Sequence, residues 1–147
     1  MKKEFKGRVI VGGYFKGEAL VSRKGFNTLA SFQKSIVTRA KKAKCSDQDN
    51  AEIFGKEMTG KVLCLPQTIG STTAGLVLMT AAEMGLQPAA MLFSRPIDSL
   101  AAAGVIMTDV WLNKKIITVD QLGDEFLEAV KTGDTVEIFE DGRVLIE

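Results

Sequence analysis

The sequence predicts an α/β fold in which a small mixed sheet is flanked by helices. Residues 62–65 form a short apolar run that suits a buried strand, and a helical pattern runs from Ala74 to residue 84. A second apolar run at residues 89–93 follows, and the order strand, helix, strand indicates a parallel crossover. The turn signal Glu-Asp-Gly-Arg at 140–143 lies between two apolar runs and predicts an antiparallel hairpin.

The chain length of 147 residues suits one domain, which we expect to span residues 1–147. At its N-terminal side, residues 5–11 alternate in polarity and reach a glycine pair, and residues 17–22 form a second apolar run. These two segments predict strands joined in a hairpin by a glycine-rich corner. Residues 22–29 have the composition of a loop, and the apolar positions of residues 30–44 fit a helix only in part.

The segment after the central helix predicts one short helix and one strand. Gly85 and Pro88 provide the stop signal of the central helix. Residues 98–104 read as a short helix, capped by aspartate and closed by glycine, and residues 105–107 as an apolar strand. Trp111 then falls in a loop, where a single tryptophan is expected to act as a packing anchor.

The C-terminal part predicts a strand at 115–119 and an amphipathic helix within 120–130, with Leu122, Phe126, Leu127 and Val130 on one face. The hairpin of residues 135–139 and 144–146 follows.

Composition restricts the class of partner. The formal net charge is +1, so no global field favours nucleic acid or an anionic membrane. The basic cluster at 34–44 lacks interleaved aromatic residues and is interpreted as a solvated helix face or a partner contact. No apolar run reaches membrane-spanning length, and residues 1–6 lack the apolar core of a signal peptide, so a cytoplasmic location is expected.

The sequence contains no histidine, which removes the commonest general base and metal ligand. Cys45 and Cys64 make no recognisable metal set by themselves and are interpreted as reduced thiols. Asp47 and Asp49 could contact a cation, although a solvated turn is the favoured interpretation. Any catalysis must therefore use hydroxyl, carboxylate, lysine or arginine groups, or groups supplied by another chain.

The loop between the central strand and helix is the main candidate site. It contains Gly70, Ser71, Thr72 and Thr73, and the helix N-terminus that follows presents unpaired N–H groups and a positive dipole to an anion. The alternative is that one of the three hydroxyls only caps the helix. Arg95, with Ser94, follows the strand at 89–93 and is a further candidate, as is Arg23 for bidentate contact with an anionic ligand.

With these residues in view, the chain resembles the swivel domain of the aconitase X family. The resemblance is carried by Gly-Glu-Ala-Leu-Val-Ser at 17–22, Phe-Gly-Lys at 54–56, Gly-Lys-Val-Leu at 60–63 and Gly-Ser-Thr-Thr-Ala-Gly at 70–75. Pro-Ala-Ala at 88–90 and Gly-Asp-Thr-Val-Glu at 133–137 extend it over most of the length.

The resemblance implies a swivelling β/β/α fold and the small subunit of a hydro-lyase heterodimer that is inactive without its large subunit. It implies that the chain binds no cofactor and that an iron–sulfur or other metal centre belongs to the large subunit. It places Ser71 as the catalytic base, with Gly70, Thr72, Thr73, Arg95 and Arg23 expected to contact a small hydroxy acid. Lowering the cost of a serine alkoxide at a helix N-terminus is consistent with that role.

The substrate stays open at this point between a cis-3-hydroxy-L-proline-like and a phosphomevalonate-like compound. Many family members carry Ser-Phe-Trp-Gly-Gly where this chain has residues 25–32, which contain neither tryptophan nor paired glycines. A non-catalytic anion-binding or regulatory swivel module is the alternative function. The resemblance further implies a partner surface, for which Phe26, Leu29, Phe32 and Ile97 are the candidate exposed residues.

Overall fold

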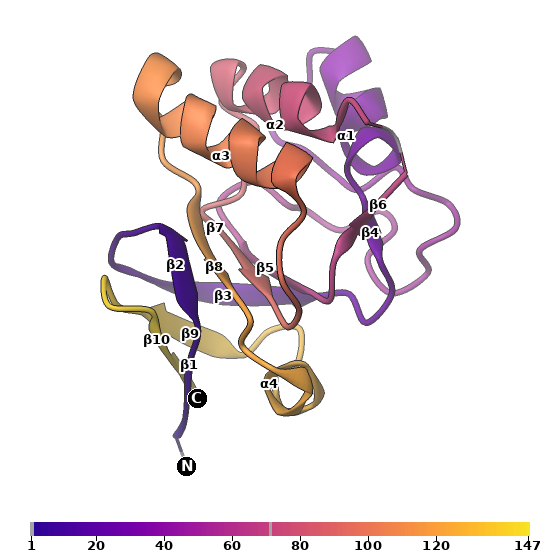
Figure 1. The fold of residues 1–147 in the computed structure, drawn as a ribbon. Coiled ribbons are helices and arrows are strands. Elements are labelled where there is room, and N and C mark those ends of the chain that lie inside the picture. Colours follow the sequence, from indigo (N-terminus) through magenta and orange to yellow (C-terminus); the bar gives the residue numbers. More distant parts are fainter. Residues whose placement is uncertain (1, 71) are drawn as a thin grey trace.

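A computed structural model describes residues 2–70 and 72–147 as a large sheet covered on one face by three helices (Figure 1). The strands are β1 (Lys3–Lys6), β2 (Arg8–Val11), β3 (Phe15–Val21), β4 (Phe26–Asn27), β5 (Val62–Leu65), β6 (Thr68–Ile69), β7 (Ala90–Phe93), β8 (Ile117–Asp120), β9 (Thr135–Ile138) and β10 (Arg143–Ile146). The helices are α1 (Thr28–Val37), α2 (Ala74–Glu83), α3 (Ser99–Leu112) and α4 (Asp124–Ala129).

The mixed α/β class predicted from the sequence is confirmed, but the sheet is larger than expected. Eight strands follow one another in the order β1-β10-β9-β3-β5-β7-β8-β2, and β4 pairs with β6 in a separate two-stranded sheet. Strands β3, β5, β7 and β8 are parallel neighbours, whereas β3 pairs with β9, and β9 with β10, in antiparallel register.

The predicted hairpin between residues 5–11 and 17–22 is wrong. Residues 5–11 are divided at Gly7, whose N–H donates to the carbonyl of Gly142 at 3.1 Å. On one side of Gly7, β1 pairs with β10, and on the other β2 pairs with β8, so this segment joins the two ends of the sheet. These partners come from the far end of the chain, and local alternation carries no information about them.

Two hydrophobic cores lie on the two faces of the parallel strands, and they follow the alternation of side chains along each strand. Leu63 and Leu65 of β5 pack into the core beneath α1, α2 and α3, together with Met91 and Phe93 of β7. The intervening side chains join the second core, beside β9, β10 and α4; they are Val62, Cys64, Ala90 and Leu92. Full burial of β5 and β7 confirms both predicted strands.

Helix α3 replaces the short helix and strand predicted for residues 98–107. Asp98 is its N-cap and accepts from Ala101 N, as expected, but the helix continues through Gly104 to Leu112. Gly104 does not end the helix. Its lack of a side chain instead permits the close contact of α3 with α2. Trp111 lies within α3 and is 71% exposed, so it is not a packing anchor in this chain.

The other helices match their predicted regions with shifted ends. Helix α1 begins at Thr28, where Asn27 accepts from Ala30 N, and ends at Val37 within the predicted region. Helix α2 occupies the predicted position, and Gly85 beyond it has a φ of 74°. Helix α4 is shorter than predicted because Asp120 remains in β8. In the described ranges, no helix has the length and apolarity needed to cross a membrane.

Candidate functional site

The carboxyl ends of the parallel strands β3, β5, β7 and β8 meet at one edge of the sheet, where ligands gather in open α/β folds. Backbone hydrogen bonds tie the segments that follow these strands to one another. Ser94 N donates to Leu65 O at 3.0 Å, and Gly123 N donates to Ser94 O at 2.9 Å. Gln121 N also donates to Arg95 O at 3.3 Å. The positions from which side chains project at this edge are therefore ordered.

Arg23 and Arg95, which were predicted by separate arguments, line the same cavity of about 230 Å³ at this edge. The other lining residues come from α4 and are Asp124, Leu127 and Glu128. Sequence reasoning did not include these α4 residues, because the docking of α4 against the edge depends on tertiary contacts. The amphipathic pattern of 120–130 was the only signal available for them.

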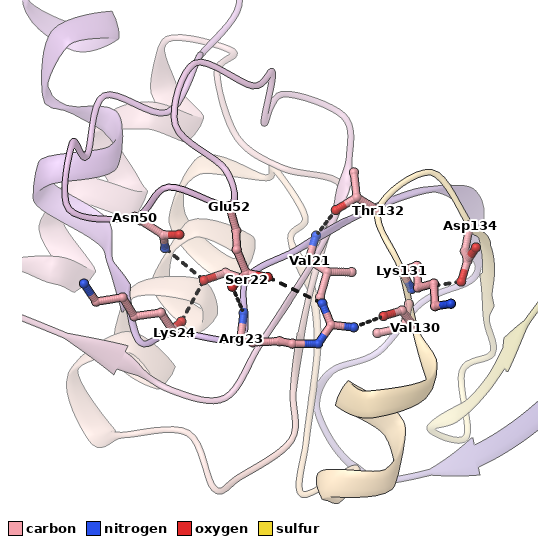
Figure 2. A network of polar contacts seen from close by, with 10 residues as sticks. All are labelled: Val21, Ser22, Arg23, Lys24, Asn50, Glu52, Val130, Lys131, Thr132 and Asp134. Atoms are coloured by element: carbon pink, nitrogen blue, oxygen red, sulfur yellow. Dashed lines mark hydrogen bonds and ion pairs between the residues drawn. The ribbon is translucent and has the colours of Figure 1, made fainter.

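The Arg23 guanidinium is already engaged by the protein (Figure 2). Its Nη2 donates to the Val130 carbonyl at 2.8 Å, and Nη1 lies 3.4 Å from a carboxylate oxygen of Glu52. The backbone N–H of Arg23 donates to the same carboxylate at 2.7 Å. Arg23 therefore joins the end of β3 to the end of α4, and only part of its donor set faces outward.

Arg95 is the more available cation. Among the described residues, its guanidinium has no ion pair and no side-chain hydrogen bond. The neighbouring Ser94 hydroxyl is buried and has no hydrogen-bond partner in the described part of the chain. A charged ligand at this edge would therefore find one unpaired guanidinium held on an ordered backbone.

The segment after Arg95 is held by Asp120, which was not predicted as a site residue. Asp120 is fully buried and accepts two hydrogen bonds from Arg8, at 3.0 and 2.7 Å. One of its oxygens also accepts from Ile97 N at 2.8 Å. This carboxylate thus connects β8 and β2 to the loop that carries Arg95, and it raises the pKa of the Arg8 guanidinium through the hydrogen bond and its charge.

The predicted catalytic residue, Ser71, lies outside the described residues, but its neighbours are in place. Gly70 has a φ of 95°, and a Cβ there would lie 2.7 Å from the Asn27 side chain. Asn27 is thus packed against the loop, and β4 pairs with β6 immediately before it. Position 70 therefore requires glycine for two reasons: other residues are strained at this positive φ, and their Cβ atom would clash with the Asn27 side chain.

Thr72 and Thr73 are exposed at the start of α2. Thr73 is the N-cap residue, and its side chain makes no capping hydrogen bond to the helix. The first turn of α2 contains no acidic residue. Gly70, Thr72 and Thr73 are not among the lining residues of the arginine cavity, so the structure does not bring the two groups of predicted residues into one cavity.

The remaining predicted positions have structural roles. Asp47 accepts from Asp49 N at 3.0 Å, which supports the turn interpretation of this pair. No three His, Cys, Asp or Glu residues in the described ranges are arranged to hold a metal ion.

Of the four residues predicted to be exposed for a partner chain, only Leu29 is exposed. Phe26 and Phe32 are fully buried in the core beneath the helices, and their rings form an edge-to-face pair. Ile97 packs partly against that core, whereas Leu29 is 36% exposed. Exposed apolar residues that sequence reasoning missed include Leu76 on α2, and Leu100, Val110 and Trp111 on α3.

Comparison with known proteins relates the whole chain to one family. The family model described as the aconitase X swivel domain matches residues 4–146. The phosphomevalonate dehydratase small subunit of Archaeoglobus fulgidus is 31% identical over 138 residues, which cover 94% of this chain and 93% of that protein. The protein of the same name from Methanocella arvoryzae is 30% identical, with 92% of each chain covered.

Among solved structures, the crystal structure of holo aconitase X from Thermococcus kodakaraensis superposes with a TM-score of 0.82. The two sequences are 29% identical, and the match covers 99% of this chain and 98% of that chain. The similarity in both sequence and fold therefore extends over the full length of the described chain.

Proposed function

Because the chain belongs to the aconitase X swivel-domain family, we propose that it is the small subunit of a two-chain dehydratase whose substrate is a phosphorylated hydroxy acid of the phosphomevalonate type. The observation that carries this proposal is the reciprocal coverage, 94% and 93%, with a relative named as such a small subunit. Both relatives described above carry this name, which favours the phosphomevalonate-like substrate over the hydroxyproline-like one.

Ser71 is proposed as the base that removes the proton from the carbon next to the departing hydroxyl. A serine hydroxyl has a high intrinsic pKa, so its deprotonated form needs local stabilisation. The N-terminus of α2, with no acidic residue in its first turn, favours negative charge there.

Arg95 is proposed to bind the carboxylate or phosphate of the substrate. Its position near the carboxyl end of β7 suits bidentate contact with such a group, as does a guanidinium that has no ion pair in residues 2–70 and 72–147. Arg23 stays a substrate-binding prediction, but its contacts with Glu52 and Val130 support a main role in shaping the cavity wall.

The large subunit is proposed to supply what this chain lacks. The sequence has no histidine, and the described residues contain no metal-binding group, so they do not fit an iron–sulfur or other metal centre. We place any such centre on the large subunit and assign this chain the serine base and part of the anion-binding surface. The isolated chain is then expected to be folded, free of metal and inactive.

The deciding experiment is reconstitution. The chain is co-expressed with the large subunit, and dehydration of mevalonate 5-phosphate and of cis-3-hydroxy-L-proline is measured for the complex and for each chain alone. The proposal expects turnover of the phosphorylated acid by the complex only. Stoichiometric iron or zinc in the purified small chain would contradict this division of roles. A complex that binds the substrate but is inactive would favour a non-catalytic binding module.

A further inference from the structure

A second cavity, of about 430 Å³, lies between the C-terminal half of α1 and the loop that follows it. Its volume is within the range of small-molecule sites. It shares no lining residue with the cavity of Arg23 and Arg95. We call it the lysine cavity, because Lys34, Lys42 and Lys44 line it together with Cys45, Gln48 and Phe54.

The wall of the lysine cavity is held by hydrogen bonds although it contains little regular structure. Met58 N donates to Ala43 O at 2.7 Å, and Cys45 N donates to Lys56 O at 2.9 Å. The Ser35 hydroxyl contacts both the N–H and the carbonyl of Lys44, which fixes this wall to α1. A cavity braced in this way is formed before any ligand arrives, so binding requires little ordering of the backbone.

The charges around the lysine cavity are unbalanced. Lys42 lies 3.2 Å from a carboxylate oxygen of Glu57. Lys34 and Lys44 have no carboxylate partner among the described residues, and no acidic residue lines the cavity. An anion bound in the cavity would supply the counter-charge that Lys34 and Lys44 lack. A solvated helix face does not account for the whole basic cluster, because Lys42 and Lys44 lie beyond the end of α1. They nevertheless line the same cavity as Lys34.

An aromatic ring adds a second kind of contact. Phe54 lines the same cavity and is 49% exposed, although the neighbouring Ile53 is fully buried in the core. The buried Cys45 also contributes to the lining. A lining that combines an exposed ring with two lysines lacking carboxylate partners among the described residues matches a ligand with an anionic end and a flat or apolar body.

We propose that the lysine cavity binds a small organic phosphate, with Lys34 and Lys44 contacting the phosphate oxygens and Phe54 packing against the organic body. This site is separate from the proposed substrate site and does not depend on dehydratase activity. Lysine contacts a phosphate as a point charge, so the site selects for charge and for a body that covers the ring.

The test is a nuclear magnetic resonance titration of the ¹⁵N-labelled full chain with ADP, pyrophosphate and adenosine. ADP is expected to shift resonances of residues 34–48 and 54–55 and to bind more tightly than pyrophosphate, because only ADP offers a ring to Phe54. Adenosine is expected to bind much more weakly than either. No shift in these residues with ADP at about 10 mM, a concentration that detects even very weak complexes, would overturn the proposal.

Matched variants separate a specific site from general attraction of anions. Lys34→Ala/Lys44→Ala is expected to weaken ADP binding at least about tenfold, the effect of losing charge-assisted contacts. Phe54→Ala is expected to weaken ADP binding but leave pyrophosphate binding unchanged. The control Lys16→Ala/Lys114→Ala removes the same charge elsewhere and should bind ADP as the wild type does; equal weakening in this control would contradict the proposal. The titration needs neither the large subunit nor the dehydratase substrate, so failure to bind ADP and failure of the proposed dehydratase function are distinguishable.

Discussion

Gly75 of α2 and Gly104 of α3 meet so closely that a Cβ atom built on Gly104 would lie 2.5 Å from the Cα of Gly75. A Cβ on Gly75 would in turn lie 2.5 Å from the carbonyl oxygen of Leu100. The obstructing atoms belong to the backbone and cannot rotate away. This contact fixes the N-terminal turn of α2, which follows the candidate catalytic loop, against α3.

Gly104→Ala is therefore expected to destabilise the protein, although alanine is the better helix former by up to about 1 kcal/mol. Forcing the two helices apart should outweigh that gain and leave a net loss of about 1–3 kcal/mol, the usual cost of overpacking. Urea unfolding measures the change, and Ala103→Ser on the exposed side of α3 is the control. Unchanged or increased stability of Gly104→Ala would show that the helices separate without cost.

Ser71→Ala in the reconstituted enzyme is expected to reduce kcat at least about a hundredfold, the scale for loss of a positioned general base. Thr72→Ala and Thr73→Ala, the adjacent hydroxyls, should each have much smaller effects. The fold should be nearly unchanged in all three, since loss of a helix cap costs only about 1 kcal/mol. Steady-state kinetics and thermal unfolding measure both quantities, and near wild-type turnover of Ser71→Ala would return the loop to a structural role.

Arg95→Lys is expected to act mainly on substrate affinity. Lysine keeps the charge but loses the planar pair of donors, so KM should rise about tenfold or more while kcat changes little. Arg23→Lys provides the comparison, because its guanidinium already binds Glu52 and Val130 and its replacement should instead lower stability. A fall in kcat with unchanged KM in Arg95→Lys would contradict a role in ground-state binding.

Asp120→Asn is expected to destabilise the chain by about 1–3 kcal/mol, because the amide cannot accept all three hydrogen bonds that the buried carboxylate accepts. Its NH₂ group would also face a cationic donor. In the reconstituted enzyme KM should rise as well, since the Ile97 N–H that positions the loop after Arg95 loses its acceptor. Asp109→Asn in α3 is the matched control, and equal stability of the two variants would show that the Arg8 contact contributes nothing.

Stability is expected to fall in alkaline solution through Cys64. Complete burial raises the pKa of the Cys64 thiol well above its ordinary value of 9.0. The folded state therefore retains a proton that the unfolded chain releases, so this contribution is complete below about pH 9 and is lost as the pH rises further. Burial also raises the pKa of the Cys45 thiol, which adds to the same alkaline loss of stability.

Urea unfolding between about pH 8 and 10 measures this effect through the linkage between stability and proton binding. Cys64→Ala should start from a lower stability, because it leaves a cavity in the core, but should lose less on going to high pH. The same decline in the wild type and in Cys64→Ala would assign the alkaline loss to other groups, such as Tyr14, whose pKa is raised by its hydrogen bond to Glu137.

Much of the parallel half of the fold was predictable because its signals are local. Apolar runs at β5 and β7, the glycine beyond α2 and the turn between β9 and β10 each specify one element within a few residues. Arg95 could be proposed because it follows a buried strand at the ligand-binding edge, and Arg23 because a guanidinium can contact an anion through two donors. Their arrival in one cavity follows from the parallel register of β3, β5 and β7.

The failures arise where distant segments decide the outcome. Gly104 resembles a helix end in sequence, but in the fold it is the place where α2 approaches α3. The split of residues 5–11 at Gly7 depends on Asp120 and Gly142, since a Cβ on Gly7 would lie 2.3 Å from the Asp120 carbonyl oxygen. Neither partner is near in the chain, so periodicity could not reveal the break.

The sequence by itself therefore determined the class of fold, the central strand, loop and helix, and the residue types at the candidate site. Only the tertiary structure decided that Glu52 and Val130 engage the Arg23 guanidinium, that Asp120 holds the loop after Arg95, and that Lys34, Lys42 and Lys44 share a cavity. The physical reason is that propensity and hydrophobic period act over a few residues, whereas charge pairing and cavity shape depend on groups brought together from distant parts of the chain.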